Sequence, residues 1–471
     1  MPRSAEATVQ PLEASGARSG ASRPNPWCRA LQAFLILMPF LHAFGLGAWA
    51  PVPLVYASAM LIAAISFGAV GWIWLEKSDL YLGGMWLFGV LAITIHREYA
   101  GEKNLNHAIV VLFTVAVFYI WMRAWIFRSR ITIDQLGAAA TVGLLVSSAA
   151  IIFEFWAANS PGYYLADVIP YSTEDLPFAL VLEDWRRPRG LAAEPGFSAM
   201  VFEALGPLAA AFLLKRRSLV LLCAPVIACG FALLFSAGAI SALLLTVLIL
   251  AVAGRSRAVK LLVIAALVTV GAVAVFGGEL IVSLLDQLVG RKVFDLFVQG
   301  DVNVGEAAGR YEAYRAGVEM FTIYPFGIGW GMVSQMFDSG RVVPGLSVLT
   351  SRGLLSLYLE ILASAGVLGF ASYAAFHVSK IRRAARSSVT EAPYVLFGLV
   401  ALSLHHAFVL EFWFPMLWFY FALTDALTAR ERVRLGHAPT ASSESISLGR
   451  PPLARSESGA RITGHEVAWD H

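Results

Sequence analysis

The run LGAAATVGLLVSSAAIIFEFW, at residues 136–156, decides the class of fold. It is as long as the roughly 17 to 25 residues that cross a hydrocarbon core as a helix. Its one charged residue is Glu154. Similar runs recur on both sides of it, and the whole chain is 58% hydrophobic and only 14% charged. This composition excludes the ordinary soluble classes and predicts an integral membrane protein.

Working outward from that run, we predict an all-α polytopic fold with about twelve transmembrane helices. The predicted spans lie near residues 28–49, 52–75, 80–96, 107–127, 136–156, 196–214, 218–235, 238–253, 260–277, 353–378, 392–409 and 412–428.

Basic residues beside the spans predict the orientation, because they tend to stay on the cytoplasmic side. Counting spans puts the basic clusters on one face: Arg123/Arg128/Arg130, Lys215/Arg216/Arg217, Arg255/Arg257/Lys260, Lys380/Arg382/Arg383/Arg386 and Arg430/Arg432/Arg434. Both termini are then cytoplasmic, and the opposite, extracytoplasmic face carries two long loops, at residues 157–195 and 278–352.

The transmembrane domain at residues 28–428 is flanked by two tails, residues 1–27 and 429–471, whose polar, small-residue composition predicts disorder. The three cysteines fall in or beside predicted spans, which excludes a periplasmic disulfide framework. The net charge of +3 is spread over many loops and indicates no nucleic-acid partner.

The first long loop ends in EDWRRPRGLAAEPGFSAM, at residues 183–200. Arg186, Arg187 and Arg189 cluster there, on the face where arginines beside a span are disfavoured. A guanidinium matches phosphate oxygens bidentately and stays charged at any physiological pH. The cluster therefore indicates a site for a phosphate-bearing lipid. For Arg186 and Arg187, pairing with the two preceding acids or with lipid headgroups is the alternative.

A helix is expected to begin just after Arg189, at Pro195. Proline at a helix start leaves free amide groups and the positive end of the dipole facing the loop, which suits an anion. Glu194 would lie at this helix mouth, where it could cap the helix, pair with Arg189 or act as a base on a sugar hydroxyl. Capping is the commonest of these roles.

The second long loop contains GRYEAYRAGVEMFTIYPFGIGWG, at residues 309–331. We predict an amphipathic helix that carries Arg310 and Arg315 and stops before Pro325. Glycines 327, 329 and 331 then permit a tight turn and a close backbone approach to a ligand. Surface pairing of the two arginines with glutamates four residues away is the alternative reading.

Three segments together resemble the signature regions of the bacterial O-antigen ligase and polysaccharide polymerase superfamily: RGLAAEPGFSA at residues 189–199, the run at 309–331, and LYLEILASAGVLGF at 357–370. The run LLFSAGAISALLL at 233–245 is similar to the short serine-containing span of that family. The resemblance covers most of the membrane part. It implies a GT-C-like fold and a metal-independent, inverting glycosyltransferase without a cofactor. A periplasmic loop would close over an undecaprenyl-diphosphate-linked glycan.

Carried over by position, Arg189 and Arg310 would bind the diphosphate and stabilise it as it leaves. Ligases carry His-Asn ahead of the last motif, whereas this chain has Leu355 and Ser356. Among its histidines we expect only His96 and His107 on the outer face. The 189–199 pattern is instead similar to exopolysaccharide or capsule polymerases, with Glu194 as the candidate base or positioner. Glu154 is explained by its place near a span end.

The sequence therefore predicts a bacterial inner-membrane polymerase of undecaprenyl-diphosphate-linked repeat units, making exopolysaccharide, capsule or O-antigen. Donor and acceptor are both lipid-linked glycans, and a chain-length regulator is a further candidate partner. An O-antigen or protein glycan ligase is the near alternative, and a secondary transporter or lipid-linked sugar flippase is the alternative of another class. The catalytic candidates are Arg189, Arg310 and Glu194, and the substrate-binding candidates are Arg186, Arg187, Arg315, Tyr311, Glu203 and Arg352.

Overall fold

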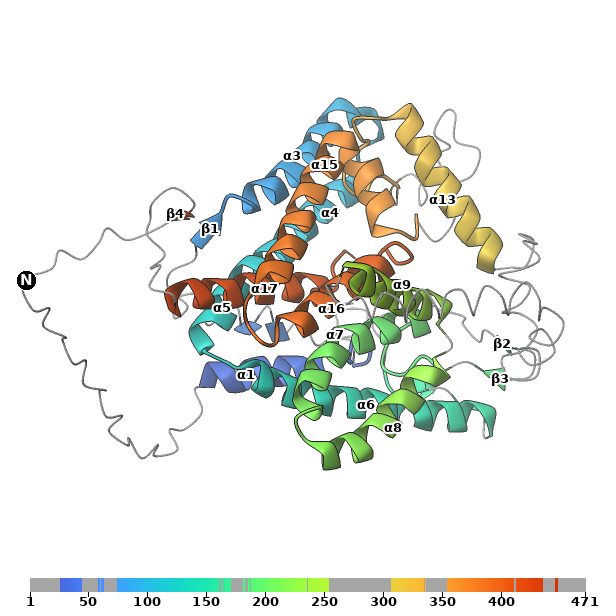
Figure 1. The fold of residues 1–471 in the computed structure, drawn as a ribbon. Helices are drawn as coiled ribbons and strands as arrows, with labels where there is room; N and C mark the ends of the chain where they lie inside the picture. Colours follow the sequence, from blue (N-terminus) through green and yellow to red (C-terminus); the bar gives the residue numbers. More distant parts are fainter. Residues whose placement is uncertain are drawn as a thin grey trace, which may run out of the picture.

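The fold is described from a computed structural model, in which helices dominate (Figure 1). The structure describes residues 26–44, 74–160, 188–234, 236–253, 306–333, 354–410 and 412–434, with short stretches at 58–59, 61–62, 162–163, 165–170, 181–182, 185–186, 335 and 445–447.

Twelve α-helices form the described part of the chain: α1 (Pro26–Leu37), α3 (Asp79–Ile95), α4 (Glu102–Thr114), α5 (Met122–Ser129), α6 (Ile133–Asn159), α7 (Pro195–Leu213), α8 (Arg217–Leu233), α9 (Ala237–Ala253), α13 (Glu306–Ile323), α15 (Leu357–Arg386), α16 (Ala392–His405) and α17 (Pro415–Arg434). A π-helical stretch, η3 (Val115–Trp121), joins α4 to α5. Short 3-10 turns are η2 (Arg97–Tyr99) and η4 (Leu165–Asp167).

Two small antiparallel sheets accompany the helices. Strand β1 (Trp74–Glu76) pairs with β4 (Ser445–Ser447), and β2 (Val181–Leu182) pairs with β3 (Trp185–Arg186). The β2–β3 hairpin lies beside the C-terminal end of α6 in Figure 1. Strand β4 falls inside the tail predicted to be disordered, and α17 also reaches further into that tail than expected.

Among the described residues, four helical segments are long and apolar enough to cross a membrane: Glu102–Ser129, Ile133–Asn159, Pro195–Leu213 and Leu357–Arg386. Helices α3, α8 and α16 and the segment Gly238–Ala253 are apolar but shorter. The predicted helical, multi-pass membrane fold is confirmed at this level. The count of about twelve spans and the GT-C-like arrangement stay predictions. The predicted span at 260–277 lies outside the described residues.

Helix α17 is the centre of the bundle, with every residue from Pro415 to Ala426 buried. It packs against α5, α7, α15 and α16. A helix that is apolar on all sides belongs in an interior, so its sequence agrees with its place. Its one buried acid, Asp425, must therefore find partners inside the bundle.

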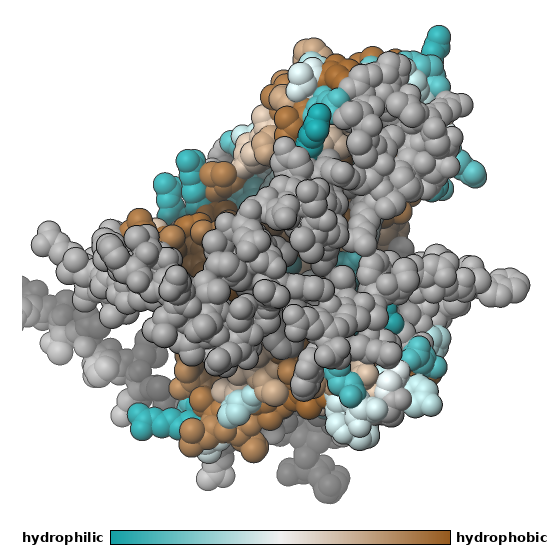
Figure 2. Space-filling view, turned by 90° about the vertical axis from the view of Figure 1, so that its right-hand side faces the viewer, coloured by the Kyte–Doolittle hydropathy of each residue, from teal (hydrophilic) through white to brown (hydrophobic). Residues whose placement is uncertain are grey.

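The outward faces of several helices expose large apolar side chains. Leu80 and Ile95 of α3 are 60% and 64% exposed, and Leu221 of α8 is 79% exposed. Figure 2 shows such apolar surface, in brown, both above and below a grey area on one side of the molecule. Surface of this kind suits contact with lipid, because exposing large apolar side chains to water is unfavourable.

The basic clusters predicted to share one face meet at one end of the molecule. Lys215 pairs with Glu391 at 3.2 Å, and Arg216 pairs with Asp134 at 2.8 Å. The serine at 388 bonds to Glu431 of α17. These contacts join the interhelical connections and helix ends in which four of the five basic clusters lie. The fifth cluster, at residues 255–260, lies outside the described part. The side of the membrane on which this end lies stays a prediction.

Candidate substrate site at the Arg189 loop

The Arg189 loop, residues 188–198, leads into α7 and is held by a buried acid of α6. The carboxylate of Glu154 accepts the backbone N–H groups of Arg189 at 2.8 Å, Gly190 at 2.6 Å and Leu165 at 3.3 Å. A buried acid within a span is expensive unless donors surround it. Glu154 lies near the end of α6, as expected, and in addition it holds two returning loops through these backbone donors.

The side chain of Arg189 lies beside the same acid. Its Nε is 4.0 Å from Glu154 Oε1, which is longer than a hydrogen bond, and the side chain is 12% exposed. From the other side, Ser198 of α7 donates its hydroxyl to the carbonyl of Arg189 at 2.5 Å. Gly190 has a φ of +64°, which lets the chain turn between these two contacts. The backbone of Arg189 is thus held at the mouth of α7, with its guanidinium beside Glu154.

His42 holds the loop from a third side. Its ring Nδ1 accepts the backbone N–H of Ala193 at 3.0 Å, and the backbone N–H of His42 donates to the carbonyl of Leu191 at 3.2 Å. The ring stacks on Phe197 with centroids 5.6 Å apart and meets Phe414 edge-on at 5.8 Å. These contacts fix both the position and the plane of the imidazole.

The same hydrogen bond also fixes the tautomer of His42. Because Nδ1 accepts a hydrogen bond from a backbone N–H, the neutral ring carries its hydrogen on Nε2. Within the described residues this Nε2–H has no acceptor. The sequence analysis missed His42, since it lay inside the predicted span 28–49. Helix α1 ends at Leu37, which releases His42 into the loop region.

Glu194 is the N-cap residue of α7, and Pro195 occupies the first turn, as predicted. The Glu194 side chain makes no capping hydrogen bond, however. Capping, the role favoured on statistical grounds, is therefore excluded. The roles of partner to Arg189 or of base stay predictions.

Helix α7, which begins in the first signature region, and the other two signature regions all contact the last residue of α16 or the turn that follows it, residues 405–409. Glu203 of α7 pairs through Oε2 with Nδ1 of His405 at 2.8 Å, and both side chains are buried. Tyr314 of α13 donates its hydroxyl to the carbonyl of Ala407. The N–H of Leu357, which opens α15, lies 3.0 Å from the carbonyl of His406. Regions far apart in sequence thus share one anchor.

The glycine-rich turn after α13 packs on α15. The N–H of Ile328 donates to the carbonyl of Ala363 at 2.8 Å, and that of Gly329 to Ser364 at 2.9 Å. Gly327, Gly329 and Gly331 all have positive φ, as the sequence predicted for a tight turn. The close approach that they permit is to protein, however, because an added Cβ at Gly327 would lie 2.6 Å from the backbone of α15.

The remaining predicted residues are placed only in part. Arg186 lies on β3, and Arg310 and Tyr311 lie on α13, whereas Arg187 and Arg352 lie outside the described residues. Arg315 is exposed on α13. The meeting of Arg189 with Arg310 stays a prediction. In the described part of the chain, no three His, Cys, Asp or Glu side chains gather as a metal site would require.

The fold and this site define a multi-pass helical membrane protein in which α7, α13 and α15 meet at residues 405–409. A family model described as O-Antigen ligase matches residues 204–374, which include α13 and the first part of α15. The resemblance to the O-antigen ligase and polymerase superfamily is thereby confirmed over this segment. The Arg189 loop and the 405–409 turn lie outside the match. No curated protein matches the chain.

Proposed function

We propose that this protein is an inner-membrane glycosyltransferase that polymerises undecaprenyl-diphosphate-linked repeat units on the periplasmic face. The observation that carries the proposal is the contact of α7, α13 and α15 with residues 405–409, together with the hydrogen bonds that hold the backbone of Arg189 at the mouth of α7. A family match alone would leave the Arg189 loop unexplained, because the loop precedes the matched segment.

In this reaction an acceptor sugar hydroxyl attacks the anomeric carbon of the donor. The bond from that carbon to the diphosphate oxygen breaks, the diphosphate leaves with the electron pair, and the configuration inverts. Arg189 and Arg310 balance the charge that grows on the leaving group. The hydroxyl proton passes to Glu194. An arginine whose backbone is already held needs less reorganisation during this step.

His42 adds a donor to the same site. With Nδ1 occupied by the N–H of Ala193, its Nε2–H can donate but the ring cannot accept a proton there. We assign it to a diphosphate oxygen beside Arg189. A neutral imidazole donor of this kind polarises a ligand oxygen without serving as the base.

A ligase that transfers the finished glycan is the second candidate. The description of the matching family favours it. So does the backbone hydrogen bond from Leu357 to the carbonyl of His406, which brings a histidine residue next to the positions where ligases of this family carry His-Asn. The two candidates differ in the acceptor and share the donor chemistry.

The deciding experiment is the lipid-linked glycan profile of a strain that lacks this protein, separated by membrane leaflet. A missing polymerase leaves single repeat units on undecaprenyl diphosphate at the periplasmic face. Accumulation of long polymers there would instead establish the ligase. Single units trapped on the cytoplasmic face would overturn both and indicate a flippase.

The arginines are tested in the complemented strain. We expect Arg189→Ala and Arg310→Ala each to lower polymer formation by about 100-fold or more, the range seen when one charge-stabilising donor is removed. Arg217→Ala, at an exposed arginine of α8, is the matched control and should retain polymer. Normal polymer from either test variant, at equal protein level, would remove that arginine from the mechanism.

A further inference from the structure

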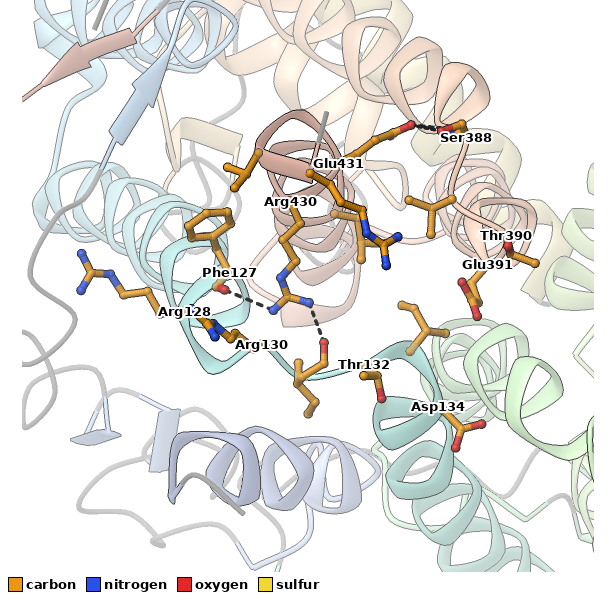
Figure 3. A pocket seen from close by; sticks show the side chains of 16 residues that line it. Phe127, Arg128, Arg130, Thr132, Asp134, Ser388, Thr390, Glu391, Arg430 and Glu431 are labelled. Carbon is orange, nitrogen blue, oxygen red and sulfur yellow. Dashed lines mark hydrogen bonds between the residues drawn. The ribbon is translucent and has the colours of Figure 1, made fainter. Parts of the chain in front are cut away.

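A second charged site lies at the end of the bundle where the basic clusters meet, and the proposed reaction does not use it. A cavity of about 1180 Å³ opens there between the end of α5, the start of α6, the connection from α15 to α16 and the end of α17 (Figure 3). Its charged lining residues are Arg128, Arg130, Arg430, Arg434, Asp134, Glu391 and Glu431.

The acids of the cavity are already engaged. Asp134 bonds to Arg216 at 2.8 Å and Glu391 to Lys215 at 3.2 Å, and neither of these cations lines the cavity. Glu431 accepts the backbone N–H of Ser388 at 2.9 Å, and in Figure 3 its carboxylate is turned toward that residue. These contacts leave the lining arginines without an acid from the cavity wall.

The arginines that line the cavity make different contacts from the acids. Arg430 donates to the carbonyl of Ile131 at 2.6 Å and to that of Phe127 at 3.3 Å, so it ties α17 to the end of α5. Its buried Nε–H has no acceptor among the described residues. Arg130 and Arg434 are exposed and have no acid partner in the described part of the chain.

Two like charges lie side by side in this cavity. Arg130 lies beside Arg430 in Figure 3, whereas Arg128 extends away from the cavity. Burial, and after it the neighbouring Arg130 guanidinium, lower the pKa of Arg430 to about 10. Arg130 also adopts a left-handed backbone with φ of 53°, which is uncommon for a residue other than glycine. An anion between these guanidinium groups would relieve their repulsion.

The rest of the lining is apolar, which distinguishes this cavity from an ordinary solvated charge cluster. Its members are Phe127, Ile131, Ile133, Val389, Leu427 and Val433. Apolar walls beside paired guanidinium groups, at the ends of membrane-crossing helices, match a molecule with a phosphate head and an acyl body. The cavity is also larger than the roughly 300 to 1,000 Å³ typical of small-molecule pockets.

We propose that this cavity is a binding site for an anionic phospholipid, whose phosphodiester headgroup is held by Arg130, Arg430 and Arg434. The headgroup oxygens bridge the guanidinium groups, and the upper part of the acyl chains covers the apolar wall. The bound lipid would join the end of α17 to the start of α6. The site is independent of the glycan-transfer reaction.

The test is native mass spectrometry of the full-length protein, stripped of lipid in detergent and titrated with phosphatidylglycerol. Arg130→Gln/Arg434→Gln is compared with Arg382→Gln/Arg432→Gln, which removes two exposed arginines that do not line the cavity. At about fivefold per arginine, we expect the pocket variant to need about 25-fold more lipid for half occupancy. The control should stay within about twofold. Equal effects in both variants would overturn the site.

Two further arms identify the ligand class and guard against misfolding. Zwitterionic phosphatidylcholine should bind weakly. Soluble glycerol 3-phosphate should fail to displace phosphatidylglycerol at matched concentration, and displacement would overturn the assignment to a lipid. Arg434→Gln alone, at the last residue of α17, is the second variant should the double variant fold poorly. Glycan transfer enters none of these measurements, so their failure leaves the proposed function untouched.

Discussion

At the scale of single residues, the polar side chains that hold the Arg189 loop are buried and bond to distant parts of the chain. Glu154 and His42 each lie in a predicted span, where a sequence pattern gives no indication that a distant loop returns to them. Arg189, by contrast, could be chosen as a candidate from its place beside a predicted helix start. The buried residues that hold its loop could not be identified in this way, since their partners are set by tertiary contact.

Glu154→Gln tests whether the Glu154 carboxylate holds the two loops. The amide keeps one acceptor oxygen but turns an NH₂ group toward backbone donors, so at least one of the N–H groups of Arg189, Gly190 and Leu165 loses its partner. We expect a loss of about 2 to 3 kcal/mol in the free energy of unfolding, together with loss of polymer formation. Unfolding followed in detergent measures the first effect. Glu102→Gln, at an exposed acid, should leave both unchanged.

Two substitutions at His42 separate the effect of its donor nitrogen from that of its acceptor nitrogen. In His42→Asn the side-chain oxygen can still accept the N–H of Ala193, but the donor at the position of Nε2–H is lost. We expect near-normal stability and a fall of about 10-fold or more in transfer rate at saturating donor. His42→Phe keeps the ring contacts but orphans the Ala193 N–H, so it should also lose about 1 to 3 kcal/mol of stability. Full activity of the asparagine variant would remove the donor role.

At the scale of elements, the pairing of the glycine-rich turn with α15 is the clearest feature. The sequence correctly predicted that α13 stops before Pro325 and that glycines follow in a tight turn. It did not predict that Gly366 breaks α15, with φ of 67° and ψ of −172°, to receive that turn. An apolar run with two glycines is compatible with a straight helix, so the break is visible only once its partner is in place.

Gly366→Ala should therefore be severe. A Cβ at this position would overlap the backbone of Phe326, and the backbone angle itself disfavours any residue with a side chain. We expect a loss of at least about 3 kcal/mol, or failure to accumulate in the membrane. Gly83→Ala in α3 is the matched control, because nothing lies within 4 Å of its added Cβ. That control should gain about 0.5 to 1 kcal/mol, and equal behaviour of the two variants would argue against the break.

At the scale of the whole molecule, the four basic clusters that the structure describes lie at one end, as the sequence predicted, but some of their members are not at the surface. The sequence assigns Arg123, Lys380 and Arg383 to the cytoplasmic face with no indication of burial. In the structure Arg123 and Lys380 are fully buried. The hydrophobic runs that locate the spans do not show whether a cation points into the bundle, because its acid partners come from other helices. The grouping succeeded since it depends only on which end of a span each residue occupies.

These cations meet the acid of the central helix. Asp425 of α17 lies 2.7 Å from Lys380 Nζ and 3.2 Å from Arg123 Nη1, and Arg383 also contacts it. Arg123 pairs in turn with Asp79 at 2.9 Å, and the hydroxyl of Tyr119 bonds to Asp425 at 2.8 Å. The network links α3, η3, α5, α15 and α17 by ion pairs, so its integrity bears on the whole bundle.

Asp425→Asn should destabilise the protein by about 3 to 5 kcal/mol, because it leaves buried cations without their shared acid. Asp134→Asn removes a half-exposed pair and should cost less than about 1 kcal/mol. Adding Lys380→Met to Asp425→Asn removes one of the stranded cations and should restore part of the loss, a coupling that unfolding in detergent can measure as a double-mutant cycle. Strictly additive effects of the two changes would mean that Lys380 and Asp425 do not act as one unit.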